Sequence, residues 1–176
     1  MKFKAISNSL QQCEYGWKLS IMNIEIYEDY SDEGIALARQ LFAEYAQSLG
    51  FPLDFQDFNT ELTELPGEYS PPFGRLLLGM YEDGPVGCIA LRKIDEKICE
   101  LKRMYIKPKF RRKGMGKVMA QEIIKRAKKI GYKKMRLDTL KTMKTALNIY
   151  KTLDFKEILP YRFNPLKDAV YLELEL

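Results

Sequence analysis

The 176-residue chain contains no histidine, a single tryptophan and only three cysteines. Without histidine, Ser-His-Asp and Cys-His catalysis and the histidine-containing zinc sites are excluded. Acid–base chemistry would have to come from carboxylates, tyrosine, lysine, cysteine or water. Cys13, Cys88 and Cys99 are odd in number and widely spaced, which is typical of a reducing compartment and does not match a zinc pattern. We therefore expect no metal site.

Long apolar runs are also missing. No stretch approaches the roughly 18 apolar residues of a membrane-spanning helix, and the first 20 residues lack the apolar core of a signal peptide. We expect a cytoplasmic protein that does not contact a membrane. Residues 1–21 show no clear periodicity, whereas a regular pattern begins at Met22. The sequence thus predicts an N-terminal extension over 1–21 and one folded domain over 22–176.

Acidic residues are scarce in one segment. Residues 107–144 contain 15 Lys and Arg but only two acids, a net charge of +13, whereas the rest of the chain has a net charge of −8. A strongly basic segment in an otherwise acidic protein attracts anions. The segment could bind a phosphate-bearing cofactor or a nucleic acid, or it could be a solvated surface.

Hydrophobic periodicity and turn residues predict the secondary structure. Strands are expected at 24–28, 75–81, 85–93, 98–106, 133–140, 155–159 and 169–176. Helices are expected between an N-cap at Ser31 and Gly50, near 59–65, at 115–130 and at 142–153. This order predicts an α/β or α+β domain with a mixed sheet.

The run "RRKGMGK" (111–117) lies between a predicted strand and a predicted helix. Glycines let an anion approach the backbone, and a helix N-terminus offers unpaired N–H groups, so this loop suits a phosphate or a diphosphate. It is not a P-loop, because Val118 follows Lys117, and it is not a dinucleotide fingerprint, because Met119 replaces the third glycine.

The pattern Arg-x-x-Gly-x-Gly, from Arg111 to Gly116, resembles the acetyl-CoA-binding signature of the GNAT (Gcn5-related) N-acetyltransferase superfamily. The downstream run "TALNIYKTLDF" (145–155) is similar to a second element of that family, A-x-x-x-Y-x-x-x-G-F. Ala146, Tyr150 and Phe155 match it, whereas Asp154 stands where the family usually has glycine. Met143 lies where many members carry an asparagine that contacts the cofactor.

The resemblance implies a single-domain fold with a mixed, mostly antiparallel sheet flanked by helices. Two central parallel strands, 98–106 and 133–139, would splay into a V that holds acetyl-CoA. The pantetheine would pair with the backbone around Met104 and Ile106, the diphosphate would lie on the N–H groups of residues 112–117, and Lys109 would be near the 3′-phosphate. The implied cofactor-binding residues are Met104, Tyr105, Ile106, Arg111, Arg112, Lys113, Gly114, Met115, Gly116, Lys117, Thr139, Met143, Ala146 and Tyr150.

Tyr150 occupies the position of the family's catalytic tyrosine, and a phenol is protonated at neutral pH and can give its proton to a departing thiolate; the alternative is a core aromatic. Glu100 is the candidate base, directly or through a water, unless it is a structural carboxylate paired with Lys102 or Arg136. Asp138 is a second candidate base.

These residues predict an N-acetyltransferase that moves an acetyl group from acetyl-CoA to a primary amine in a ternary complex. The alternatives are a basic nucleic-acid-binding domain and a GNAT-fold protein that binds acyl-CoA without catalysis. The acceptor would be a small-molecule or peptide amine, held by residues 51–74 and 160–168. Five acids in the first segment indicate a cationic amine: Asp54, Asp57, Glu61, Glu64 and Glu68. Dimers are common in the family, so the resemblance also allows a homodimer.

Overall fold

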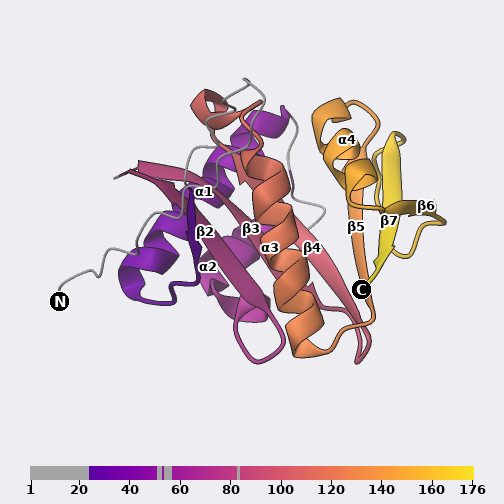
Figure 1. Ribbon diagram of the computed structural model, residues 1–176, viewed down its shortest axis with the longest axis horizontal. Helices are drawn as coiled ribbons and strands as arrows, with labels where there is room; N and C mark the ends of the chain where they lie inside the picture. The colour runs from indigo at the N-terminus through magenta and orange to yellow at the C-terminus, as the bar shows by residue number, and fades with distance from the viewer. Residues whose placement is uncertain (1–23, 51–52, 54–56, 83) are drawn as a thin grey trace, which may run out of the picture.

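The computed structural model describes residues 24–50, 53, 57–82 and 84–176. The predicted extension over 1–21 lies outside these residues. Within them, one seven-stranded sheet runs in the order β1-β2-β3-β4-β5-β7-β6 (Figure 1). The strands are β1 (Glu25–Tyr27), β2 (Arg75–Tyr81), β3 (Gly84–Lys93), β4 (Ile98–Ile106), β5 (Lys134–Leu140), β6 (Lys156–Ile158) and β7 (Ala169–Glu175).

The helices are α1 (Asp32–Leu49), α2 (Phe58–Glu64), α3 (Met115–Ile130) and α4 (Lys144–Thr152), with short 3₁₀ turns η2 (Gly67–Tyr69) and η3 (Pro108–Phe110). Their ends follow the local chemistry that the sequence indicated. The side chain of Ser31 accepts a hydrogen bond from the N–H of Gly34 at the start of α1. Gly50 and Gly131 adopt left-handed backbone conformations just after α1 and α3, where a Cβ atom would be unfavourable.

The helices form one layer on each face of the sheet (Figure 1). Residues of α3 and α4, among them Met119, Ile123 and Tyr150, share a core with the sheet face that Leu77 and Leu137 occupy. A second core on the opposite face joins the sheet to α1, α2 and η2. Burial of these two apolar faces is the main stabilising contribution to the fold.

Among the strands of the described residues, only one neighbouring pair is parallel. β4 and β5 pair in parallel from Ile98 with Lys134 to Glu100 with Arg136, while every other neighbouring pair is antiparallel. Beyond Glu100 the two strands separate (Figure 1). The predicted fold class, a mixed and mostly antiparallel sheet with a V-shaped opening between two central parallel strands, is confirmed.

None of the described helices combines the length and the apolar character needed to cross a bilayer. Among the same residues, no group of three or more metal-ligating side chains is arranged to hold a metal ion.

Candidate active site

A cavity of about 630 Å³ occupies the opening between β4 and β5. Its walls come from the outer half of β4, the loop and first turn of α3, the end of β5, and α4. The residues predicted to bind the cofactor all line it except Lys113, and Tyr45, Ser48, Phe110, Asp138, Thr142, Lys144, Thr145 and Ile149 complete it. The residues that the sequence set apart are therefore close together in space.

The wall formed by β4 is an open strand edge. Among the described residues, pairing with β5 stops at Glu100, and the end of β4 from Met104 to Ile106 lines the cavity. An unpaired strand edge can bind an extended ligand through its main-chain groups. At the end of this edge, the carbonyl of Ile106 accepts a hydrogen bond from Nε of Arg111 at 2.8 Å. Because a carbonyl oxygen has two lone pairs, a ligand could use the second one while Arg111 stays bound.

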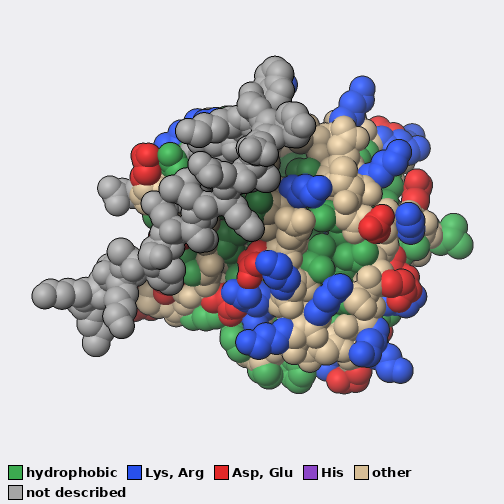
Figure 2. Space-filling model, viewed as in Figure 1, with side chains coloured by type: hydrophobic (Ala, Val, Ile, Leu, Met, Phe, Trp, Pro, Cys, Tyr) green, Lys and Arg blue, Asp and Glu red, His purple; other side chains and the backbone are tan. Residues whose placement is uncertain are grey.

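The loop before α3 has two residues in left-handed conformations. Arg112 has φ +61° and Gly114 has φ +81°. No side-chain hydrogen bond caps the start of α3 within the described part of the chain. The partial positive charge of the helix N-terminus thus adds to the exposed cations of Arg112 and Lys117 at the edge of the cavity. Figure 2 shows Lys and Arg side chains over α3 and around α4 on this face of the molecule.

Glycine is favoured at positions 114 and 116 for different structural reasons. A Cβ atom on Gly114 would have no atom within 4 Å, so glycine is favoured there by the left-handed backbone. A Cβ atom on Gly116 would lie 3.0 Å from Cδ1 of Ile149, so this glycine lets α3 pack closely against α4.

Tyr150 lies in the wall formed by α4. Its ring packs on Phe155 with 5.4 Å between centroids, and its hydroxyl contacts Sδ of Met104 on β4 at 3.8 Å. Burial raises the pKa of the Tyr150 phenol, so the hydroxyl stays protonated. The side chain therefore spans the opening between α4 and β4 with a donor at its tip.

Asp154 adopts the left-handed conformation that explains the family's glycine at this position. Its φ is +66°, in the turn between α4 and β6. Aspartate is one of the few residues that adopts this conformation readily. The departure from the motif therefore leaves the turn, and the placement of Phe155 under Tyr150, intact.

Glu100 lies behind the cavity and not in its wall. Its side chain is 1% exposed and accepts hydrogen bonds from Arg92, Arg162 and Tyr161 at 2.7, 2.9 and 2.7 Å. Burial alone would raise the pKa of Glu100, but the positive charges of Lys102 and the two arginines outweigh it and the pKa is lowered. A carboxylate held in this way is a poor proton acceptor, so the geometry does not favour the predicted base role.

Asp138, the other candidate base, does line the cavity. Its side chain is 7% exposed, with Nζ of Lys102 and Nη2 of Arg162 each 3.8 Å from its oxygens, and the amide of Asn164 donates to it at 2.8 Å. Lys102 was not predicted as a site residue. Burial lowers its pKa to about 8, against the opposing effect of the carboxylates of Glu100 and Asp138.

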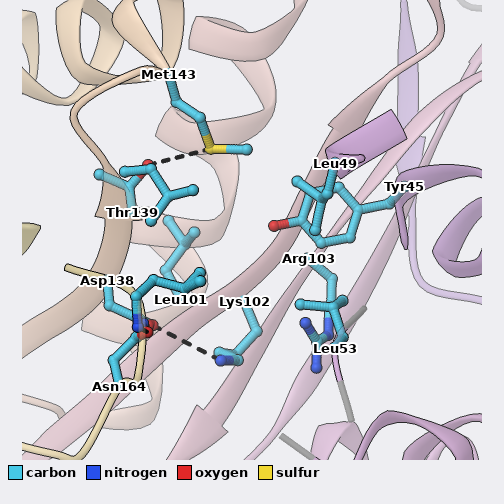
Figure 3. A pocket seen from close by; sticks show the side chains of 12 residues that line it. Tyr45, Leu49, Leu53, Leu101, Lys102, Arg103, Asp138, Thr139, Met143 and Asn164 are labelled. Carbon is cyan, nitrogen blue, oxygen red and sulfur yellow. Dashed lines mark hydrogen bonds and ion pairs between the residues drawn. The ribbon is translucent and has the colours of Figure 1, made fainter. Parts of the chain in front are cut away.

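A smaller pocket of about 50 Å³ adjoins this group on the side of α1 (Figure 3). It shares Tyr45, Asp138, Thr139 and Met143 with the larger cavity. The ammonium of Lys102 and the guanidinium of Arg103 reach into it from β4, and Asn164 closes it from the loop before β7 (Figure 3). Part of the predicted acceptor frame, residues 160–168, thus lies beside the junction of the two spaces.

Some of the acids expected to attract a cationic amine form ion pairs with arginines of the protein itself. Glu61 is paired with Arg103, and Glu68 is paired with Arg92. Asp57, Glu61, Glu64 and Glu68 line a separate hollow outside the main cavity, and Asp54 lies outside the described residues. The structure thus gives little support to these acids as an amine-binding set.

Comparison with known proteins identifies the family to which the chain belongs. The model of the acetyltransferase (GNAT) family matches residues 35–155. An uncharacterized N-acetyltransferase of Schizosaccharomyces pombe is 36% identical over 160 residues, which cover 90% of this chain and 95% of the relative.

Solved structures share the fold. An acetyltransferase from Streptococcus agalactiae superimposes with a TM-score of 0.72 at 22% identity, covering 87% of this chain and 98% of that one. A GNAT family acetyltransferase from Elizabethkingia anophelis, solved with acetyl-CoA bound, gives a TM-score of 0.64 at 23% identity, covering 88% and 99%.

The fold and the matches define an acyltransferase. The chain belongs to the GNAT family of acetyltransferases. The predicted family and the prediction of an enzyme are confirmed.

Proposed function

We propose that the chain transfers an acetyl group from acetyl-CoA to a primary amine by direct attack in a ternary complex. The observation that carries this proposal is the 630 Å³ cavity, which connects an unpaired strand edge, a cationic helix start and the Tyr150 hydroxyl. These are the features needed to hold an extended pantetheine arm, a diphosphate and a departing sulfur. Acetyl-CoA is bound in the related fold from Elizabethkingia anophelis, which supports the choice of co-substrate.

In this proposal the residues predicted from the sequence hold the two ends of the cofactor. The edge of β4 around Met104 and Ile106 pairs with the pantetheine, and the N–H groups of residues 112–117 hold the diphosphate. A backbone N–H near Met104 stabilises the negative charge that develops on the thioester oxygen. Met143 contributes its backbone and its contact with Thr139, whose hydroxyl lies 3.4 Å from its sulfur.

The acceptor amine enters from the smaller pocket. Asp138 lines both spaces and its two cations lie 3.8 Å away, whereas Glu100 lines neither and is held by arginines at 2.7 and 2.9 Å. We therefore assign Asp138, rather than Glu100, the task of taking a proton from the incoming ammonium. The neutral nitrogen then attacks the thioester carbon and the new N–C bond forms. As the C–S bond breaks, the proton that the nitrogen must still lose passes to the departing sulfur. Tyr150 donates a hydrogen bond to the leaving thiolate. Because its pKa is raised, this hydrogen bond stabilises the thiolate charge without requiring complete proton transfer.

Glu100 has an indirect role in this scheme. Its carboxylate fixes Arg162 and Tyr161, and these two residues belong to the loop that reaches the acceptor pocket. Arg162 in turn approaches Asp138 at 3.8 Å. Glu100 therefore holds the acceptor side of the site in place.

Two measurements test the proposal. Calorimetric titration with acetyl-CoA should show saturable binding, and a panel of small amines and peptides should include an acceptor that releases free CoA thiol. Asp138→Asn should lower kcat in that assay while leaving the dissociation constant of acetyl-CoA within about threefold. A chain that bound no acetyl-CoA at millimolar concentration would contradict the proposal.

A further inference from the structure

Strand β4 changes its alternation at one point. Cys99 and Leu101 are buried in the core beneath α3 and α4, and Met104 and Ile106 pack against this same core. Tyr105 is buried in the opposite core. In a regular strand, residues two apart share a face, so Leu101 and Met104 could not both face α3 and α4. One extra residue must be present between them.

The pairing with β3 locates this extra residue. Tyr105 is opposite Cys88 and Lys102 is opposite Ala90. Two residues of β4, Arg103 and Met104, are therefore accommodated where β3 has only one, which is a β-bulge. Arg103 has φ +54°, a left-handed conformation that an arginine rarely adopts. The backbone is unfavourable for this side chain, so other contacts must hold it.

Those contacts come from the segment between α1 and β2. The side chain of Arg103 is 3% exposed and forms an ion pair with Glu61 of α2. Nε of Arg103 donates to Oε1 of Glu61 at 2.7 Å, and Nη2 donates to the other carboxylate oxygen. The hydroxyl of Tyr69 donates to Oε1 of Glu61 at 2.7 Å, and the guanidinium lies 5.1 Å from the centre of the Phe58 ring. Four residues from three elements thus form one compact group.

We propose that the Arg103–Glu61 pair is a positioning device for acetyl transfer, because it holds the bulge that turns Met104 and Ile106 toward the cavity. Without the bulge, the residues after Lys102 would exchange faces. Lys102 and Arg103 would then no longer face the acceptor side together. The inference uses the acetyl transfer proposed above only for its turnover readout. The effect on the strand itself can be measured without any ligand.

The test compares glycine with alanine in a chain that lacks the ion pair. R103A/E61Q and R103G/E61Q both remove the charges of the two paired residues together. Glycine adopts positive φ without a Cβ penalty, whereas alanine does not. In an ordinary strand position the order is reversed, because glycine weakens a strand. If the ion pair maintains the bulge, the glycine variant should be closer to wild type. If the pair only stabilises the strand, the alanine variant should be closer to wild type.

We expect faster amide hydrogen exchange at residues 101–106 in R103A/E61Q, and exchange close to wild type in R103G/E61Q. With the amine found by screening, kcat should fall at least about tenfold in the alanine variant, as expected for a misplaced oxyanion donor. The glycine variant should stay within about threefold of wild type. E173Q is the matched control, because Glu173 on β7 pairs with Lys134 and Arg136 at 2.8 and 2.7 Å outside the cavity. It should lower the melting temperature without changing kcat.

Equal exchange in the two double variants, or faster exchange in the glycine variant, would overturn the inference. Absence of turnover in wild type would count against the proposed function alone, since the exchange comparison would still decide the role of the bulge. Altered exchange at 101–106 together with unchanged kcat would show a structural pair and would also overturn the inference.

Discussion

Tyr150→Phe removes one oxygen atom from the wall of the cavity and leaves the ring on Phe155. The partner that the structure gives this hydroxyl is the sulfur of Met104, 3.8 Å away. Thioether sulfur is a weak acceptor, so little native hydrogen bonding is lost. The free energy of unfolding should therefore change by less than about 1 kcal/mol.

The effect on turnover should be larger. A hydrogen bond to a charged group contributes about 1.5–3 kcal/mol, and the departing thiolate carries such a charge. If Tyr150 donates this hydrogen bond in the transition state, its loss lowers kcat by roughly 10- to 150-fold, since about 1.4 kcal/mol corresponds to a factor of ten. The KM for acetyl-CoA should change much less, because the contact with the thiolate forms during the reaction.

The assay is the release of free CoA thiol at saturating acetyl-CoA and amine, with melting temperatures measured in parallel. Tyr132→Phe is the matched control. Tyr132 is buried in the same core as Tyr150, and its hydroxyl donates to the carbonyl of Phe73 at 3.0 Å. The control should lose stability and keep its kcat. A Tyr150→Phe enzyme with wild-type kcat, or one whose kcat falls no more than that of the control, would refute the donor role.

Three further predictions concern charge and backbone. Arg112→Glu should weaken acetyl-CoA binding about tenfold or more in calorimetry, whereas Lys128→Glu, an equal charge reversal at the far end of α3, should change it less than threefold; equal effects would indicate non-specific electrostatics. Asp154→Gly should raise the free energy of unfolding by about 0.5–1 kcal/mol in urea titration, because φ is +66° at this residue; a loss would contradict the argument. Folded Lys102, with a pKa of about 8, loses its proton before the unfolded chain does at about 10.4. Its unfavourable burial as a cation is therefore relieved as pH rises from 8 to 10, and the stability of wild type relative to Lys102→Met should increase over this range. A difference in the free energy of unfolding that stayed constant with pH would contradict the lowered pKa of Lys102.

Local sequence chemistry was sufficient for most of the fold. The N-cap at Ser31 and the glycines at 50 and 131 marked helix ends that the structure reproduces. The glycine loop before α3 predicted a phosphate site from residues close together in the chain, whereas the run 145–155 on α4 entered the prediction through the family resemblance. The parallel pairing of β4 with β5 came from the family resemblance, since strand order is a long-range property.

The environment of Glu100 could not be predicted in the same way. Its partners Arg92, Arg162 and Tyr161 come from β3 and from the loop before β7. Of the two partners that the sequence suggested, the charge of Lys102 does act on Glu100 and lowers its pKa, whereas Arg136 pairs with Glu173. Proximity between strands and loops far apart in the chain determines whether a carboxylate is a base or part of an ion-pair cluster.

The bulge in β4 did leave a readable signal. Apolar residues that face α3 and α4 occupy odd positions up to Leu101 and even positions from Met104 onward. A change of parity within one strand predicts an inserted residue. This change of parity locates the bulge near Arg103. The partner of Arg103, Glu61, lies far away in the sequence and could be identified only from the structure.

A crystal structure of the chain with coenzyme A tests the proposed cofactor site most directly. We expect the pantetheine between β4 and β5 along residues 104–106, with the diphosphate against the backbone of residues 112–117 and the sulfur near Tyr150. Coenzyme A bound elsewhere, or an opening between β4 and β5 that stays empty at saturating coenzyme A, would contradict it.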